Sequence, residues 1–387
     1  MSQSDPKLNI NSSVRQNVFV RQESIAARQP PIPTRGVLAW INDNLFATPL
    51  SGFVTLACIA LVALVVPDLI RYLFIDAIWS AEDGVPCRVE GTGACWAFVE
   101  RKLSFFVYGS YPREMVWRVN LTLLMGALLV GWLLIPRLPA KRLASVLFFI
   151  AYPVAGYWLA YGFEGVLPKV STNLWGGVFV SLLVALVGIV MSLPIGIVLA
   201  LGRRSHMPIV KFVSIVLIEF VRGVPLITVL FMANTMLPLF VPQELTPDRL
   251  LRPLIGVSIF TGAYMAETIR AGLQAMPKGQ FEGAMSLGLS YWQMMRLIIL
   301  PQALTMVIPG IVNSFISLFK DTTLVAVVGI FDFLRAIEVA RLDPVWAGPS
   351  LSTTGYVFAA LFYWVFCYSM SRYSQNLEAR LAVGRRR

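Results

Sequence analysis

Long runs without a charged residue alternate along the chain with shorter polar segments. Seven such runs reach or approach the roughly 20 residues that an α-helix needs to cross about 30 Å of hydrocarbon. They are residues 44–67, 119–135, 143–163, 174–202, 223–243, 297–319 and 344–371. An eighth run, residues 253–266, is shorter and is followed by Glu267. The pattern predicts an all-α polytopic membrane protein with about eight transmembrane helices.

The first three predicted spans differ from the later ones. They contain no charged residue and no polar cluster at membrane depth, so we expect them to be scaffold. The later spans contain several prolines and polar or ionisable residues in or near the membrane. A proline inside a span leaves backbone carbonyl groups that neighbouring helices or a water-filled cavity must satisfy. The functional machinery is therefore expected in the C-terminal part of the chain.

The composition agrees with a membrane protein, since 57% of the 387 residues are hydrophobic and only 14% are charged. A soluble domain has about 25% charged residues, so a soluble enzyme and a disordered chain are both excluded. In a membrane protein the net charge of +11 reports orientation and gives no indication of nucleic-acid binding. More than half of the Lys and Arg residues lie on the side that holds residues 1–50 and 372–387. Both termini are therefore expected to be cytoplasmic.

The segments outside the predicted spans have distinct characters. Residues 1–43 are polar and contain several prolines, which predicts a flexible cytoplasmic arm with no cleavable signal peptide. Residues 376–387 form a basic cytoplasmic tail suited to an anionic inner leaflet. The first external loop, about residues 72–118, contains Cys87 and Cys95, and a local disulfide is favoured there because the loop lies outside the inner membrane.

Motifs for catalysis, metal binding and nucleotide hydrolysis are missing from the sequence. It has no Walker loop, no C-x-x-C and no H-E-x-x-H pattern, and its single histidine, His206, stands in a short basic segment. We expect no catalytic residue, no metal ligand and no cofactor bound by this chain.

The segment from Gln274 to Arg296 mixes polar and apolar residues at helical spacing. Its larger apolar residues fall on one stripe, namely Phe281, Met285, Leu289 and Trp292. Two interpretations are open. The segment is either an interfacial helix lying on the bilayer or a peg that docks into a groove of a cytoplasmic partner.

The same segment carries a family resemblance. Glu282, Gly283 and Ala284 are followed after three residues by Gly288, and after nine more by Ile298 with Leu300 and Pro301. This spacing resembles the cytoplasmic-loop signature of ABC-importer permeases, with six of seven fixed positions matched. The departure is Gly283, where the family usually has alanine, and it slightly weakens the local helix.

The resemblance extends on both sides of the loop. The segments Glu219–Leu226, Gly262–Gln274, Gly279–Ser290, Arg296–Leu304 and Phe315–Leu324 are similar to the polar amino acid permease family of ABC importers. This similarity covers about residues 171–375 and implies the five-helix core of a type I importer. The three extra spans, residues 44–163, and the Gly93–Glu100 segment resemble the longer subunits of general L-amino acid uptake systems of Gram-negative bacteria.

The resemblance implies a function and a set of partners. The chain would be a permease subunit in a bacterial inner membrane, moving L-amino acids of polar, broad range from periplasm to cytoplasm by alternating access. Its partners would be a second related permease, a periplasmic amino-acid-binding protein and a cytoplasmic ATPase dimer that holds ATP and Mg²⁺. The alternative is an ion-coupled secondary amino acid transporter, which would need an inverted repeat and intramembrane ion ligands.

The resemblance also assigns the coupling residues. A short coupling helix seated in the ATPase groove would contain Glu282, Gly283, Ala284, Leu287 and Gly288. Gly288 would let the chain turn there.

Candidates for the substrate pathway are ionisable or polar residues in or near the membrane. Glu219 and Arg222 are three residues apart, as are Glu267 and Arg270, so each pair is either an i, i+3 salt bridge or part of a recognition site. A zwitterionic amino acid needs one cationic and one anionic partner, which Arg222 with Glu219 or Glu267 would supply.

Further candidates lie on either side of these charges. Gly223 and Pro225 should distort the helix after Arg222. Asn313 and Ser317, one helical turn apart, offer either substrate hydrogen bonds or contacts between helices.

The seventh span ends at Lys320 and Asp321, which we take as outer-gate candidates. The next ten residues are too few to cross the membrane and predict a re-entrant or interfacial segment.

Overall fold

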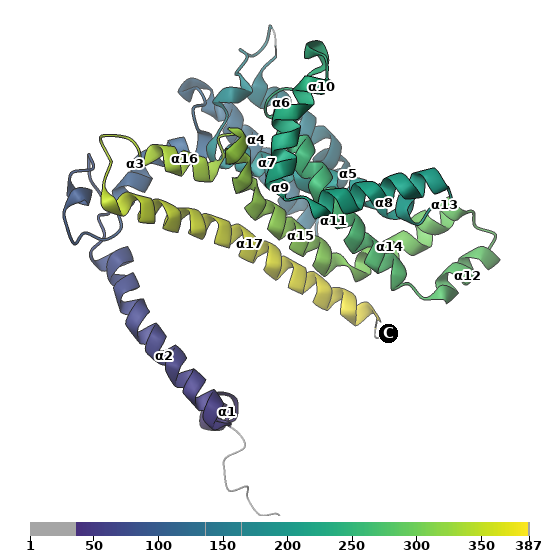
Figure 1. The fold of residues 1–387 in the computed structure, drawn as a ribbon, viewed down its shortest axis with the longest axis horizontal. Coiled ribbons are helices and arrows are strands. Elements are labelled where there is room, and N and C mark those ends of the chain that lie inside the picture. The colour runs from purple at the N-terminus through teal and green to yellow at the C-terminus, as the bar shows by residue number, and fades with distance from the viewer. Residues whose placement is uncertain (1–35, 136, 164, 386–387) are drawn as a thin grey trace, which may run out of the picture. The chain divides into compact units, whose positions relative to one another are not determined.

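Helices make up nearly all of the secondary structure in the computed structural model (Figure 1). The structure describes residues 36–135, 137–163 and 165–385, and within these ranges it has no β-strand. The all-α fold class is thus confirmed. Most of the predicted N-terminal arm and the last two residues of the tail lie outside the described residues. The chain forms two units, residues 1–70 and residues 71–387, which are considered separately.

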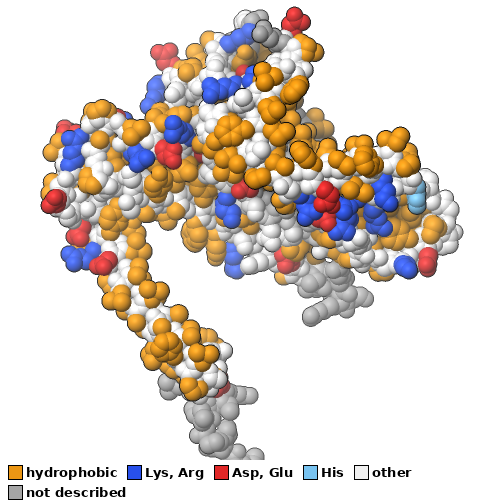
Figure 2. Space-filling view, in the orientation of Figure 1, with side chains coloured by type: hydrophobic (Ala, Val, Ile, Leu, Met, Phe, Trp, Pro, Cys, Tyr) orange, Lys and Arg blue, Asp and Glu red, His pale blue; other side chains and the backbone are white. Residues whose placement is uncertain are grey.

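The first unit contains two helices, α1 (Val37–Leu45) and α2 (Pro49–Ile70). The turn between them is fixed by Thr48 and Ser51, each of whose backbone N–H groups donates to the hydroxyl of the other. Hydrophobic side chains cover the visible face of α2 (Figure 2), and most of its large apolar residues are exposed. An exposed helix that is apolar all round suits hydrocarbon and not water.

The second unit holds the remaining helices. They are α3 (Trp96–Tyr108), α4 (Val116–Leu134), α5 (Lys141–Val146), α6 (Tyr152–Tyr161), α7 (Gly177–Arg203), α8 (Pro208–Gly223), α9 (Leu226–Phe231), α10 (Leu237–Phe240), α11 (Leu251–Gln274), α12 (Lys278–Ser286), α13 (Tyr291–Met294), α14 (Leu300–Met306), α15 (Ile308–Asp321), α16 (Phe333–Ala340) and α17 (Pro349–Arg385).

Six helical segments among the described residues are long and apolar enough to cross a membrane. They are Pro49–Ile75, Arg113–Leu134, Lys141–Tyr161, Gly177–Arg203, Ile308–Val328 and Pro349–Leu381. The pair Pro208–Gly223 and Leu226–Phe240 makes a seventh if it is counted as one span, although it bends by 110°. The predicted eighth span corresponds to α11, which has 24 residues but is too polar to pass the same test.

Helix α11 packs along α7 in the core of the second unit. Gly196 of α7 leaves so little space that a Cβ there would lie 2.7 Å from Met265, and a Cβ on Gly262 would lie 2.5 Å from Ile195. Such small residues let two helix backbones approach closely inside a membrane. More than half of the residues of α11 are buried, so this helix contacts protein more than lipid and needs less hydrophobicity than the others.

Several boundaries differ from the sequence prediction. Helix α8 begins at Pro208, inside the gap expected between two spans. The predicted span 297–319 is divided among a π-helical turn, α14 and α15, with the break at Val307 before Pro309. Helix α17 continues to Arg385, so the basic tail prolongs the last span as helix up to that residue. The break at Val307 is explained by Pro309, because a proline lacks the N–H that would continue the helical hydrogen bonds.

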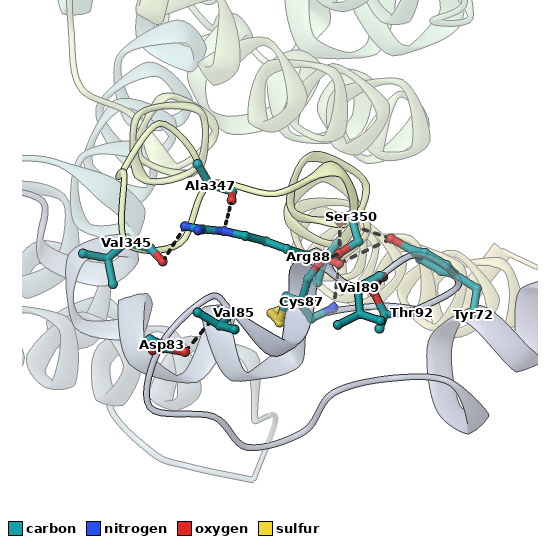
Figure 3. Close-up of a disulfide and its surroundings, with 12 residues drawn as sticks. Tyr72, Asp83, Val85, Cys87, Arg88, Val89, Thr92, Val345, Ala347 and Ser350 are labelled. Atoms are coloured by element: carbon teal, nitrogen blue, oxygen red, sulfur yellow. Dashed lines mark hydrogen bonds between the residues drawn. A yellow bond between two sulfur atoms is a disulfide. The ribbon is translucent and has the colours of Figure 1, made fainter.

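The predicted loop of residues 72–118 is folded and contains α3. A disulfide joins Cys87 to Cys95, whose Cα atoms lie 5.8 Å apart. Phe98 of α3 is fully buried and packs against Trp346, which lies between α16 and α17. Figure 3 shows Arg88 reaching from the disulfide loop toward the backbone of Val345 and Ala347. This segment is therefore tied to residues more than 250 positions away in sequence.

Candidate functional site

Helix α12 presents the coupling residues predicted from the resemblance. Ala284 is buried and attaches the helix to the bundle, whereas Glu282 and Gly283 are exposed. Leu287, just after the helix, is 75% exposed. One side of α12 thus packs on its own chain, and the other side is available to a partner.

The turn after α12 depends on Gly288, whose φ of +70° lies in the left-handed region that favours glycine. A Cβ added at Gly288 would meet no atom within 4 Å. Glycine is therefore favoured by the backbone angle and not by a lack of space for a side chain. The next helix, α13, begins with a capping box. The side chain of Ser290 accepts from the backbone N–H of Gln293, and the side chain of Gln293 accepts from the backbone N–H of Ser290.

This turn divides the apolar stripe expected over residues 274–296. Phe281 and Leu289 are half-buried, whereas Met285 and Trp292 are 58% and 69% exposed. The expectation of one continuous stripe was wrong, because the chain reverses at Gly288 and the two short helices point their side chains differently.

Two contacts join α12 to the rest of the bundle. Arg204, at the end of α7, donates a 2.9 Å hydrogen bond to the carbonyl of Leu273 and lies 5.9 Å from the ring centroid of Phe281. The side chain of Gln302 in α14 donates to Gln280 over 3.0 Å. A hollow of about 400 Å³ lies between Arg204 and the exposed face of α12. Helix α12 is thus in contact with the residue that follows α7.

Next to Arg204, Arg203 belongs to a cluster of charges contributed by α7, α8 and α11. The Glu267 carboxylate accepts from Arg203 at 3.4 Å and from Arg270 Nε at 2.8 Å, and it lies 3.8 Å from Arg222. Arg203 also donates to Glu219 over 2.8 Å. We call these five residues the charge cluster. It carries three guanidinium groups against two carboxylates.

The charge cluster shows which of the charges singled out by spacing pair with one another. Glu267 and Arg270 form the i, i+3 ion pair. Glu219 pairs with Arg203, and no ion pair with Arg222 is present among the described residues. The sequence analysis did not single out Arg203, because its partners lie 16 and 64 residues away and no local spacing reveals them.

Gly223 and Pro225 lie at the 110° bend between α8 and α9. The Arg222 guanidinium lies 5.7 Å from the ring centroid of Tyr264 in α11, within reach of a cation–π contact. The charge cluster is therefore directly beside the most strongly bent part of the membrane region. Figure 2 shows Lys and Arg side chains gathered near the single histidine, over the part of the surface where Figure 1 places α8.

Asn313 and Ser317 are both exposed on α15, and their side chains form no hydrogen bond with other described residues. Lys320, one further turn along, is also exposed. The contact between helices that was one interpretation of Asn313 and Ser317 is thus not made within the described part of this chain. These residues form a polar face on α15, which is part of the membrane-spanning segment Ile308–Val328, and none of them belongs to the charge cluster.

Beyond Lys320 and Asp321 the chain continues as a 3₁₀-helix, Thr322–Val328, and turns at Gly329 with φ of +80°. Asp332 follows and is fully buried, accepting from the backbone N–H groups of Leu334 and Arg335 as the N-cap of α16. Burial raises the pKa of Asp332 to about 7. Sequence analysis missed this aspartate, although its position before an amphipathic helix is a capping signal.

Near α16 lies an ion pair that the sequence analysis did not predict. Lys102 of α3 pairs with Asp343, and the neighbouring ammonium group lowers the pKa of that carboxyl. No cluster of three or more His, Cys, Asp or Glu residues that would suit a metal ion occurs in the described part of the chain.

Comparison with known proteins places this arrangement. Residues 192–383 match the family model described as "Binding-protein-dependent transport system inner membrane component". The inner membrane amino-acid ABC transporter permease protein YhdY of Escherichia coli (strain K12) is 47% identical over 92% of this chain and 97% of its own length. The glutamate/glutamine/aspartate/asparagine transport system permease protein BztC of Rhodobacter capsulatus is 39% identical over 94% and 98%. A crystal structure of an amino acid ABC transporter with histidines is 28% identical over 53% of this chain and 92% of its own, with a TM-score of 0.46.

Proposed function

Because this chain belongs to the binding-protein-dependent transport system inner membrane component family and is an amino-acid ABC transporter permease subunit, we propose that it carries L-amino acids into the cytoplasm. Its membrane is the inner membrane of a bacterium. The observation that carries the proposal is α12, a short helix fixed to the bundle by Ala284 with Glu282 and Leu287 exposed. The name of BztC, which includes four polar amino acids, supports a broad polar substrate range.

The free energy for transport comes from a separate ATPase dimer. The sequence contains no phosphate-binding loop of its own, so ATP and Mg²⁺ are held by that partner. The exposed side of α12 docks into the ATPase, in the manner of a helix laid into a groove. With α12 on the cytoplasmic side, both termini are cytoplasmic, and residues 72–118 face the periplasm, where an amino-acid-binding protein delivers substrate.

Alternating access follows from the path between α12 and the bend. Closure of the ATPase displaces α12, and the contacts of Arg204 with Leu273 and Phe281 transmit the movement to the end of α7. Arg203, the next residue, shares Glu267 with Arg222, which stands at the bend between α8 and α9. An exchange of partners within the charge cluster lets the bend take two arrangements in which Glu219 and Glu267 each keep a guanidinium partner.

Arg222 and Glu267 are also suited to the two charges of an amino acid. A guanidinium group binds a carboxylate in a fork geometry, and a carboxylate accepts from an ammonium group. Gly223 and Pro225 leave backbone groups at the bend for neutral hydrogen bonds. The polar face formed by Asn313, Ser317 and Lys320 lies against a second, related permease subunit, so that the pathway runs between the two. In this assignment residues 171–375 are the transport core and residues 44–163 are an addition to it.

The first test is ATPase activity of the purified complex reconstituted in liposomes. Turnover is compared with and without the binding protein, using several L-amino acids one at a time. Stimulation that depends on both binding protein and amino acid supports the import function and ranks the substrates. Uptake that follows an imposed proton or sodium gradient, with no associated ATPase, would contradict the proposal and favour secondary transport.

The coupling role of α12 is tested by Glu282→Arg. The charge reversal should abolish amino-acid uptake while leaving insertion into the membrane unchanged, because Glu282 is exposed and its side chain forms no hydrogen bond or ion pair with the described residues. Glu244→Arg is the matched control, since Glu244 is also exposed but lies before α11, at the opposite end of that helix. Normal uptake by the Glu282→Arg complex would exclude the docking assignment.

A further inference from the structure

An apolar cavity of about 480 Å³ lies between the added spans and the transport core. Its walls come from α4 and α6 on one side and from α7 and α11 on the other. The volume is within the roughly 300–1,000 Å³ typical of small-molecule sites. The charge cluster and α12 contribute nothing to its lining, so this cavity is separate from the proposed transport pathway.

The depth of the cavity matches half of a bilayer. Along α7 its lining runs from Phe179 to Val187, eight residue steps that correspond to about 12 Å of helix. One leaflet contributes about half of the roughly 30 Å of hydrocarbon. Phe179 lies close to the start of α7, so the cavity begins at the end of the bundle opposite α12. Walls made of such side chains as Leu183 and Leu254 offer water few partners and suit an acyl chain.

The lining includes aromatic rings near that end of the bundle. Tyr157 and Trp158 are 40% and 46% exposed. The Tyr157 ring centroid lies 6.1 Å from that of Trp175. Tyrosine and tryptophan at this depth are typical of the level of lipid headgroups. The faces of such rings also attract a cation.

Asp248 lines the same cavity and adds a negative charge. It is exposed, and its Oδ2 atom accepts from the Thr172 hydroxyl at 2.8 Å and from the backbone N–H of Leu250 at 3.2 Å. The two nearest arginines in sequence, Arg249 and Arg252, donate to backbone carbonyl groups. Within the described residues the Asp248 carboxylate forms no ion pair.

We propose that this cavity binds a phospholipid with an ammonium headgroup, one acyl chain lying between Leu183 and Leu254 and the ammonium group between Asp248 and Tyr157. The carboxylate and the aromatic faces favour a cation, and they disfavour a headgroup whose only charge is the phosphate. The bound lipid would fill the space between the added spans and the core.

The test compares lipids retained by the full complex in nanodiscs made from equal parts of phosphatidylethanolamine and phosphatidylglycerol. The complex is stripped of loosely bound lipid by detergent exchange, and the retained lipid is measured by mass spectrometry. The wild-type complex should retain about 10-fold more phosphatidylethanolamine than phosphatidylglycerol. This ratio corresponds to about 1.4 kcal/mol, which the carboxylate and the cation–π contacts would supply. Asp248→Asn should reduce that preference to about 2-fold or less while keeping the acceptor for Thr172.

Two further variants complete the experiment. Glu244→Gln removes an exposed carboxylate of the same segment that does not line the cavity, and it should keep the wild-type preference. Leu183→Trp fills the space of the acyl chain and should reduce retention of both lipids. An unchanged preference in Asp248→Asn, a wild-type preference for phosphatidylglycerol, or unchanged retention in Leu183→Trp would each overturn the proposal.

Discussion

Glu267 is the residue on which the charge cluster depends. It accepts from Arg203 and Arg270 and also lies close to Arg222, while its own side chain is 24% exposed. A carboxylate held by several guanidinium groups compensates charges that would otherwise be costly to desolvate. Its loss therefore affects three elements at once.

The substitution Glu267→Gln should destabilise the complex by about 1–3 kcal/mol, because it leaves three guanidinium groups against one carboxylate. Removing one partner of a fully buried ion pair costs about 3–5 kcal/mol, and the partial exposure of this site reduces that cost by about half. The thermal unfolding midpoint of the purified complex measures this loss. Glu338→Gln is the control, since Glu338 pairs with the half-exposed Arg335 and such a pair contributes about 0–1 kcal/mol. Equal midpoints for the two variants would show that the charge cluster is not a stabilising unit.

Asp332 predicts a pH dependence of stability. Its pKa is raised from 3.8 to about 7 by burial, so between these values the folded state binds a proton that the unfolded state releases. The contribution to stability is complete below about pH 4 and is lost as the pH rises through 7. Asp332→Asn keeps one of the two acceptor oxygens that cap α16 but cannot ionise. At pH 8 it should be more stable than wild type by up to about 4 kcal/mol.

The measurement for Asp332 is the unfolding midpoint between pH 5 and 8, which should fall for wild type and stay nearly level for Asp332→Asn. Asp343→Asn serves as a control of opposite sign. Lys102 lowers the pKa of Asp343, so the stability from that pair is present near neutral pH and lost in acid. A wild-type midpoint that rises toward pH 8 would contradict the assignment of Asp332.

At the scale of elements, the loop that carries α12 illustrates how two glycines in one motif have different roles. Gly283 lies within α12 and a Cβ there would meet no atom within 4 Å. Gly288 has equal space but a φ of +70°. The same substitution should therefore have opposite effects at the two positions.

Gly283→Ala should stabilise α12 by up to about 1 kcal/mol through helix propensity. Gly288→Ala should destabilise the turn by about 1–2 kcal/mol, because an L-residue is strained at positive φ. Hydrogen exchange of the amides in residues 278–294 tests both. Protection should increase in the first variant and decrease about 10-fold in the second. A change in the same direction for both would mean that the turn is not the determining feature of the loop.

The bend between α8 and α9 is the second instructive element. Proline and glycine after Arg222 predicted a distorted helix, and the two helices meet at 110°. The sequence did not reveal that α8 itself is a 16-residue helix, because Lys211, Glu219 and Arg222 interrupt its apolar residues. Once α7 and α11 supply partners for Glu219 and Arg222, these charges are compatible with a helix beside the core.

At the scale of the molecule, the second unit is closed at one end by contacts between segments far apart in sequence. The Arg88 guanidinium donates to the carbonyl groups of Pro344, Val345 and Ala347 at 2.7, 3.1 and 2.7 Å (Figure 3). The backbone N–H of Cys95 donates to the hydroxyl of Thr354. The segment that contains Arg88 and the disulfide therefore fixes the connection between α16 and α17.

Arg88→Ala should release this connection. Three charge-assisted hydrogen bonds are lost, each worth about 1.5–3 kcal/mol when its partner is left unsatisfied, although exposure of the site reduces the sum. Amide exchange in residues 343–350 should become at least several-fold faster. Arg101→Ala is the control, because Arg101 is exposed and forms no hydrogen bond with other described residues. Similar exchange in both variants would mean that the disulfide loop does not hold this connection.

The sequence by itself determined the fold class and the approximate positions of the spans, and its motif marked the segment that we propose for coupling. Each of these depends on properties that are local in the chain, namely the length of an apolar run, the spacing of a motif and the backbone preferences of glycine and proline. The resemblance carried by Glu282 to Pro301 predicted the family, and the relatives confirm it.

Only the tertiary structure decided which charges meet. Arg203 pairs with residues 16 and 64 positions away, Arg88 binds a segment more than 250 positions away, and the cavity at Asp248 needs four helices to enclose it. No periodicity encodes these contacts, because they depend on how helices pack and on which side chains the packing leaves without water. The low dielectric of the membrane makes each unpaired charge costly, so the packing and the charge pairs are selected together.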